Sequence, residues 1–268
     1  MTAPAISASL VKELREQTGA GMMDAKRALV DANGDFEAAR VLLRERGMAS
    51  AAKRAGRETT EGLVLLKVAE GRGSLVAIGC ETEPVSKNDE FRTFAEHVLE
   101  AAFSTYLAER IDQLEEERTA LIAKIGENIS IVGTVTFEPV EGGVIEGYVH
   151  KPASKLGVLV QIRSGDKELA RKLAMHIAAS APQWIGRDDV PEDVITSERE
   201  IYANSDEVLS RPDQAREKIV EGMLNKRFFA AQVLNEQLWI HDTAKTVGRA
   251  LADEGAEVLE FERFALAG

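Results

Sequence analysis

Few residues of this chain have the type and spacing that catalysis or metal binding requires. The histidines lie at positions 97, 150, 176 and 241, and no pair has the spacing of a zinc-binding helix. The single cysteine, Cys80, would form a nucleophile–base pair if a histidine lay beside it, but the pattern favours a small buried residue at a strand end. A G-x-x-x-x-G-K-S/T loop for phosphate is missing from the sequence. We therefore expect a protein that is not an enzyme and that holds no metal and no cofactor.

Two other segments are candidate binding sites. Met22 and Met23 open a helix directly after a Gly-Ala-Gly turn, and flexible methionine side chains suit a surface that adapts to a partner. The alternative is that both fill the core of a helical bundle. The second segment, residues 81–89, is a dense polar loop between a buried strand and a helix. A helix cap at Ser86 or Asn88 explains part of it, and loops on a rigid scaffold are also where binding residues concentrate.

The composition excludes several kinds of partner. The chain has 268 residues, with 45 acidic against 33 basic side chains and a net charge of −12. This acidity disfavours sequence-independent binding to nucleic acid. The longest aliphatic runs, such as residues 63–66, are far shorter than the roughly 18–20 residues of a membrane helix, and the N-terminus has no cation before Lys12, unlike a secretory signal. We expect a cytoplasmic protein that binds neither membrane nor nucleic acid directly.

The elements that position these residues fall into four predicted units. Residues 1–56 form a three-helix domain and a basic linker. The first helix is capped by Ser9, the second runs from Met22 to Ala32, and the third starts near Phe36. The linker around Lys53–Arg57 is interpreted as a solvated tether.

The core is predicted to contain two related α+β subdomains with antiparallel sheets, residues 57–142 and residues 143–191 with 237–268. Each has two strands followed by an amphipathic helix, and superposing His97 on His176 also aligns the apolar positions of the two helices. Chance similarity of amphipathic helices is the alternative. A further charged helix, Ile111–Ile125, precedes a third strand, Ile129–Phe137, and the second subdomain ends on a strand from Glu257 to Phe264.

Residues 192–236 have a different pattern. Val194, Ile201 and Val208 recur every seven residues, and Ile219, Met223 and Ala230 continue the spacing after Pro212. This pattern predicts an inserted antiparallel helical hairpin that projects as a short coiled coil. The fold class is therefore α+β.

The motifs taken together resemble the bacterial elongation factor Ts family over nearly the whole chain. The run Thr18-Gly19-Ala20-Gly21-Met22-Met23-Asp24-Ala25-Lys26 is similar to the N-terminal signature of that family. The later matching segments, in the same order, are Glu61–Val64, Cys80–Thr82, Ile125–Ile129, Gly157–Val160, Met175–Ser180, Lys218–Gly222 and Lys245–Gly248.

The resemblance implies a guanine-nucleotide exchange factor that binds the GTPase elongation factor Tu and promotes GDP release during translation elongation. It implies the same architecture, with an N-terminal bundle that resembles ubiquitin-associated (UBA-like) domains. The partner-binding residues carried over from the family are Met22, Met23, Thr82, Glu83, Pro84, Val85, Ile125 and His150.

The sequence departs from the family at one of these positions. The family loop typically reads Thr-Asp-Phe-Val, with the aromatic ring as a wedge between two GTPase helices, whereas this chain has Thr82-Glu83-Pro84-Val85. We expect Pro84 to act as a smaller, stiffer wedge. The alternative function is a non-catalytic binding or chaperone-like module for the same GTPase.

Overall fold

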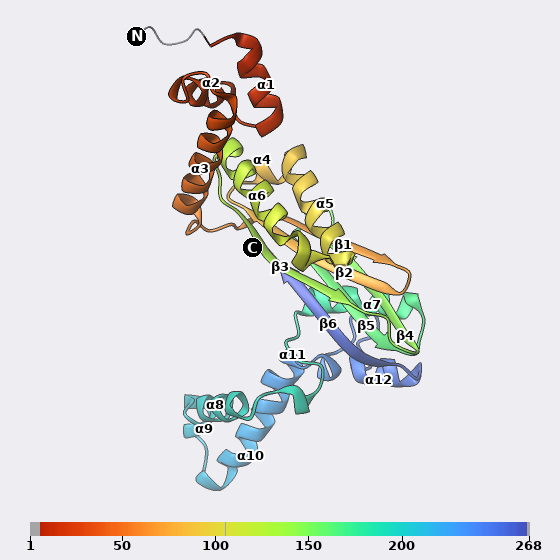
Figure 1. Ribbon diagram of the computed structural model, residues 1–268. Coiled ribbons are helices and arrows are strands. Elements are labelled where there is room, and N and C mark those ends of the chain that lie inside the picture. The colour runs from red at the N-terminus through yellow and green to blue at the C-terminus, as the bar shows by residue number, and fades with distance from the viewer. Residues whose placement is uncertain (1–5, 105, 267–268) are drawn as a thin grey trace.

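The computed structural model describes residues 6–104 and 106–266, and the chain forms an elongated molecule (Figure 1). A helical bundle stands at one end, two small sheets with their helices form the middle, and a helical hairpin projects at the other end (Figure 1). Mixed helices and two antiparallel three-stranded sheets confirm the predicted α+β class. Among the helices of the described residues, none is long and apolar enough to cross a membrane.

The N-terminal bundle consists of α1 (Ala8–Thr18), α2 (Met22–Asp31) and the first half of α3 (Phe36–Arg54). Its core is built from six small or aliphatic side chains, Val11, Leu14, Ala25, Ala28, Leu29 and Ala39. The predicted cap at Ser9 is wrong, because the Ser7 side chain accepts the hydrogen bond from the Leu10 amide and α1 begins at Ala8, directly after Ser7.

The third helix is longer than the sequence pattern suggested. It continues to Arg54, so Lys53 and Arg54 are helical, and the prediction of a free tether from Lys53 to Arg57 is wrong. The Arg54 guanidinium donates hydrogen bonds to the Gly126 carbonyl (2.9 Å) and the Ser50 carbonyl (3.1 Å). The bond to Gly126, which follows α6, attaches the end of α3 to the first core subdomain.

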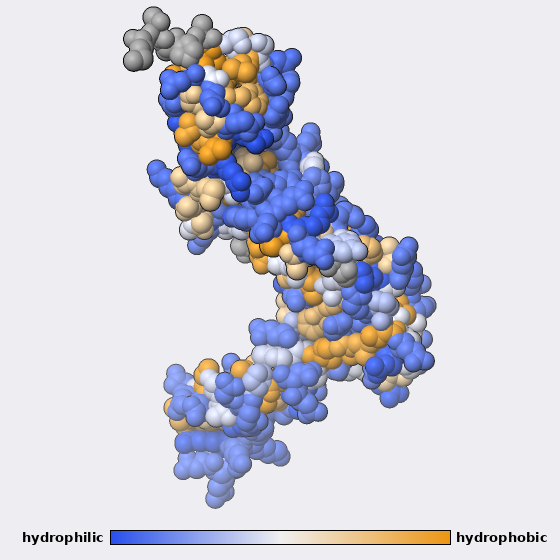
Figure 2. Space-filling view, in the orientation of Figure 1, coloured by the Kyte–Doolittle hydropathy of each residue, from blue (hydrophilic) through white to orange (hydrophobic). Residues whose placement is uncertain are grey.

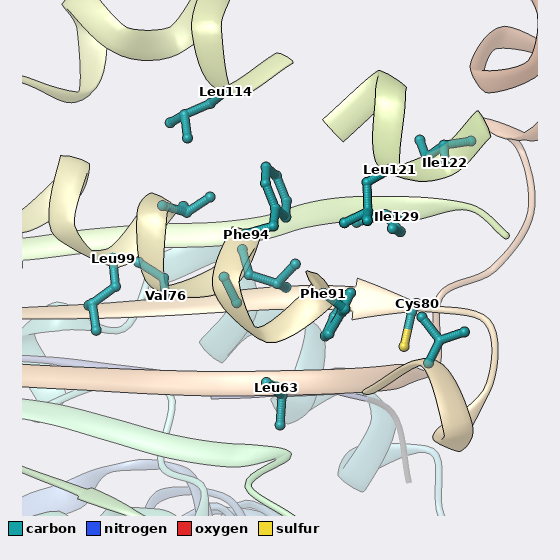
Figure 3. Packing of buried hydrophobic residues seen from close by; sticks show 14 of the residues in the cluster. Leu63, Val76, Cys80, Phe91, Phe94, Leu99, Leu114, Leu121, Ile122 and Ile129 are labelled. Carbon is teal, nitrogen blue, oxygen red and sulfur yellow. The ribbon is translucent and has the colours of Figure 1, made fainter. Parts of the chain in front are cut away.

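The first core subdomain has the strands β1 (Glu61–Ala69), β2 (Arg72–Cys80) and β3 (Ile129–Phe137) in the order β1-β2-β3. Glu70 and Gly71, both with positive φ, make the two-residue turn of the β1–β2 hairpin. Helices α5 (Asp89–Phe103) and α6 (Leu107–Ile125) cover one face of the sheet, and Figure 3 shows Phe91 and Phe94 of α5 packed against it. The predicted apolar face of α5 is buried throughout.

The second core subdomain repeats this topology. Strands β4 (Gly143–Val149), β5 (Leu156–Arg163) and β6 (Glu257–Ala265) pair in the order β4-β5-β6. Helices α7 (Lys167–Ser180) and α12 (Val247–Asp253) contribute to the core on one face of this sheet. In both subdomains two strands are followed by a helix, as predicted, and the second strand is the central one. The two histidines differ in environment, since His97 is exposed and His176 is buried.

The two sheets pack face to face. Val64, Leu75 and Ala77 of the first sheet form one apolar cluster with Ile145 and Leu159 of the second. The central strands are thus buried on both faces, which explains why their sequences are continuous apolar runs instead of alternating patterns. Glycines allow the two sheets to approach closely. A Cβ added at Gly157 would lie 2.5 Å from Val64 Cγ1, and a Cβ added at Gly133 would lie 2.7 Å from the Phe264 ring, so a side chain at either position would collide with the other sheet.

The insertion is a helical hairpin, and its seam matches the predicted one in part, because Val208 and Met223 are buried as predicted. The first arm contains η1 (Arg187–Asp189), α8 (Glu192–Ala203) and α9 (Asp206–Leu209), and the second contains α10 (Asp213–Met223), a π-helix (Leu224–Phe229), α11 (Ala230–Gln232) and η3 (Leu234–Glu236). Ile201 and Ala230, two predicted seam residues, are exposed, whereas Leu224, Phe228 and Phe229 are buried. The π-helix explains the outward position of Ala230, because its wider turn shifts the seven-residue register of the residues that follow it.

Candidate partner-binding site

The segment after β2 is a single helical turn and not the loop that the sequence suggested. Thr82 is followed by α4 (Glu83–Ser86), with Pro84 in the first turn, where its missing N–H costs no helical hydrogen bond. Thr82, Glu83 and Pro84 are exposed, but Val85 is only 9% exposed and packs into the core of the first subdomain. The Val85 side chain therefore anchors the turn to the core of the first subdomain, and Pro84 is exposed on the outer side of the turn.

An ion pair within the α4 turn and a helix cap at Asn88 hold this part of the chain in place. The Lys87 ammonium lies 2.8 Å from a carboxylate oxygen of Glu83, and this hydrogen bond lowers the pKa of Glu83. The Asn88 side chain accepts from the amides of Glu90 (2.9 Å) and Phe91 (3.2 Å), so Asn88, and not Ser86, caps α5. Glu83 is consequently an anion with one cation beside it.

A second segment, Gly126–Asn128, lies beside the turn although it is distant in sequence. The Glu127 carboxylate accepts from the Thr82 hydroxyl at 2.6 Å and from the Thr82 amide at 3.0 Å. Glu127 lies in the segment Ile125–Ile129, of which the family resemblance implies only Ile125 as a contact residue. Ile125 itself is the last residue of α6, half-buried against the core.

The segment Gly126–Asn128 is also hydrogen-bonded to Arg57, in the stretch that connects α3 to β1. The Asn128 side chain donates a hydrogen bond to the Arg57 carbonyl at 2.8 Å. The backbone N–H of Asn128 donates to a Glu81 carboxylate oxygen at 2.6 Å. Arg57 in turn lies 3.3 Å from the Glu81 carboxylate, so the three residues form a closed ring. Sequence reasoning missed Glu127, Asn128 and Arg57 as neighbours.

The two methionines lie on the surface of the bundle. Met22 is 48% exposed and Met23 is 62% exposed, at the start of α2, so the alternative that both fill the core is wrong. Figure 2 shows hydrophobic side chains gathered on the surface of this end of the molecule. Gly21 opens α2 with an extended backbone, after Gly19 has ended α1 in the left-handed conformation. The Gly-Ala-Gly turn thus joins two helices and does not follow a strand.

His150 lies apart from these residues, in the second subdomain at the end of β4. Its side chain is exposed, and its Nδ1 lies 2.8 Å from the Tyr148 hydroxyl. It begins a loop whose Ser154 carbonyl accepts from the Val64 amide at 2.6 Å. The residues predicted to bind the partner therefore lie on three parts of the structure, namely the bundle, the α4 turn with Ile125, and the β4 end.

Cys80 has the environment of a structural residue. It is buried at the end of β2, near Phe91 (Figure 3), and its thiol donates to the Thr82 carbonyl at 3.3 Å. Burial, followed by the nearby carboxylates of Glu127 and Glu61, raises the pKa of Cys80 to about 12. A thiol that stays protonated is a poor nucleophile, which argues against the interpretation of this chain as a Cys80-dependent enzyme.

Comparison with known proteins identifies the family of this chain. The family model for elongation factor TS matches residues 81–268. Elongation factor Ts of Sodalis glossinidius is 43% identical over 271 residues, covering 97% of this chain and 90% of that protein. The elongation factors Ts of Pasteurella multocida and Cronobacter sakazakii are 44% and 42% identical over 262 residues, with 97% of this chain covered in each case. The chain therefore belongs to the elongation factor Ts family.

Proposed function

We propose that this chain is a guanine-nucleotide exchange factor for elongation factor Tu and promotes GDP release during translation elongation in the cytoplasm. The observation that carries the proposal is the α4 turn, where Pro84 is exposed while Val85 and Glu127 hold the turn in place. A fixed projection of this kind is suited to insertion between elements of another protein. Family membership over nearly the whole chain supports the same function.

The function needs no catalytic group in this chain. An exchange factor binds the nucleotide-free GTPase more tightly than the loaded one, so by linkage the nucleotide and the factor weaken each other's binding. Insertion of the turn near the Mg²⁺ of the GTPase would displace the ligands of that ion. Mg²⁺ requires near-octahedral coordination, and displacements of about an ångström are therefore enough to loosen the phosphate site.

Each proposed contact has a separate part in this function. Met22 and Met23 adapt to the nucleotide-binding domain of the GTPase, and the turn with Ile125 acts beside them. His150 contacts a different domain of the GTPase. Pro84 replaces a longer aromatic wedge, and Val85, although predicted as a contact residue, is buried and acts by supporting the turn from the core.

The test is the release of labelled GDP from purified elongation factor Tu, followed by stopped-flow fluorescence at increasing concentrations of this chain. We expect the release rate to rise with concentration and to saturate. A chain that binds the GTPase but leaves the release rate unchanged would be the non-catalytic binding or chaperone-like module, and the exchange proposal would be wrong.

A further inference from the structure

We propose that Glu127 is a positioning residue for nucleotide exchange, at the centre of a clamp that fixes two partner-binding surfaces relative to each other. The clamp comprises Arg54, Arg57, Glu81, Thr82, Glu127 and Asn128. This inference rests on the proposed function, because it concerns how the α4 turn and the bundle are presented to the same GTPase.

The bond between Glu127 and Thr82 departs from the usual chemistry of a helix start. Thr82 is the N-cap residue of α4, where a threonine hydroxyl normally accepts from a helix amide. Here the hydroxyl donates to Glu127 Oε1 at 2.6 Å, and the Thr82 amide donates to Oε2 at 3.0 Å. The capping interaction is thus replaced by two bonds to a charged acceptor 45 residues away in the chain. A local rule broken in this way is typical of a functional constraint.

The two bonds between Thr82 and Glu127 restrain the exposed end of the turn, which does not pack against the core. Val85 and Ser86 are buried below the turn, whereas Thr82 is exposed and has Glu127 beside it. Pro84 lies between these two anchors. A turn held in its binding conformation before contact loses less conformational freedom when it is inserted into a partner, so more of the contact energy acts on the GTPase.

The other bonds of the clamp lead to the bundle. Arg54, the last residue of α3, donates to the Gly126 carbonyl, and the Arg57 carbonyl accepts from Asn128. Helix α3 has 19 residues, so it is about 28 Å long, and a tilt of about 5° at its base would move its far end by about 2.5 Å. The segment that holds Thr82 therefore also contributes, together with the packing of α3 along α6, to the position of the bundle that carries Met22 and Met23.

The core below the clamp is complete without the Glu127 side chain. The buried cluster of the first subdomain is formed by Val76, Ile78, Phe91, Phe94 and their apolar neighbours. Glu127 is half-exposed and contributes hydrogen bonds, not packing. We therefore expect Glu127→Ala to keep the fold, which separates positioning from folding.

The experiment compares wild type with Glu127→Ala and Glu127→Gln in GDP release from elongation factor Tu. The concentration dependence separates the maximal release rate from the half-saturating concentration. Glu127→Ala is expected to lower the maximal rate about tenfold, the equivalent of a lost hydrogen bond to a charged group, with half-saturation changed by less than about threefold. Glu127→Gln keeps an acceptor oxygen for Thr82 and should give an intermediate rate. Glu257→Ala, which removes a surface ion pair with Arg163 in the other subdomain, is the matched control.

A second readout is independent of the GTPase. Hydrogen exchange at the Thr82 amide should be faster in Glu127→Ala than in wild type, because that amide loses its acceptor. An unchanged maximal rate, or a reduced rate with unchanged exchange at Thr82, would overturn the inference. If wild type itself failed to accelerate GDP release, the proposed function would be wrong, and the Thr82 amide would still report whether Glu127 restrains the turn.

Discussion

Replacing both exposed methionines of α2 tests whether the bundle binds the GTPase. In the free protein Met22 and Met23 have 48% and 62% of their surface exposed, and they sit at the start of the helix where they leave the bundle core intact. Met22→Ala with Met23→Ala therefore removes apolar surface that only a partner can bury. We expect weaker binding to nucleotide-free elongation factor Tu and an unchanged melting temperature.

The size of the effect follows from the exposed fractions. Complete burial of a methionine side chain contributes about 1.5–3 kcal/mol, so about half of that value per residue is available to a partner. Since alanine retains one carbon, the double substitution should cost about 1–2.5 kcal/mol of binding free energy, which is about 5- to 60-fold in Kd.

The assay is isothermal titration calorimetry of each variant against nucleotide-free elongation factor Tu. Met48→Ala is the control, because Met48 is 57% exposed on α3 and was not predicted to contact the partner. A double variant that binds within about twofold of wild type would refute a contact between the methionines and the GTPase. Met48→Ala weakening the binding as much as the double variant does would refute it as well.

Three further results are expected. Cys80, with its pKa raised to about 12 by burial, should resist alkylation at pH 8 in the native chain and react only after unfolding; rapid native labelling would contradict its placement. Burial lowers the pKa of His176, so the unfolded chain binds the proton more readily and the free energy of unfolding should fall as the pH drops below about 6.5, an effect lost in His176→Leu. Urea titrations between pH 5 and 7 measure that dependence, and an equal slope in the variant would count against it. Pro84→Phe should accelerate GDP release in stopped-flow experiments, whereas an equal rate would show that the wedge at this position is unimportant.

The local elements could be predicted well because their signals are periodic. The strand Ile129–Phe137 has the bounds that the sequence indicated, and the apolar face of α5 is buried as its spacing required. Two adjacent methionines after a glycine turn correctly indicated an exposed apolar surface. In these cases the information lies within a few residues of the element itself.

The errors concern features that depend on distant contacts or on helix geometry. The π-helix Leu224–Phe229 changes which side chains face inward, and a seven-residue pattern carries no sign of that change. Arg54 was assigned to a tether because its acceptor, the Gly126 carbonyl, lies 72 residues away. The bond between Thr82 and Glu127 spans 45 residues for the same reason. Only the fold brings these groups together.

The most direct test of the exchange mechanism is the affinity of this chain for elongation factor Tu with and without GDP, measured by calorimetry under one set of conditions. Mutual weakening predicts that GDP raises the Kd for this chain, and that this chain raises the Kd for GDP by the same factor. Equal affinity for the nucleotide-free and the GDP-bound GTPase would contradict the account, because a factor that does not discriminate between the two states cannot shift nucleotide binding.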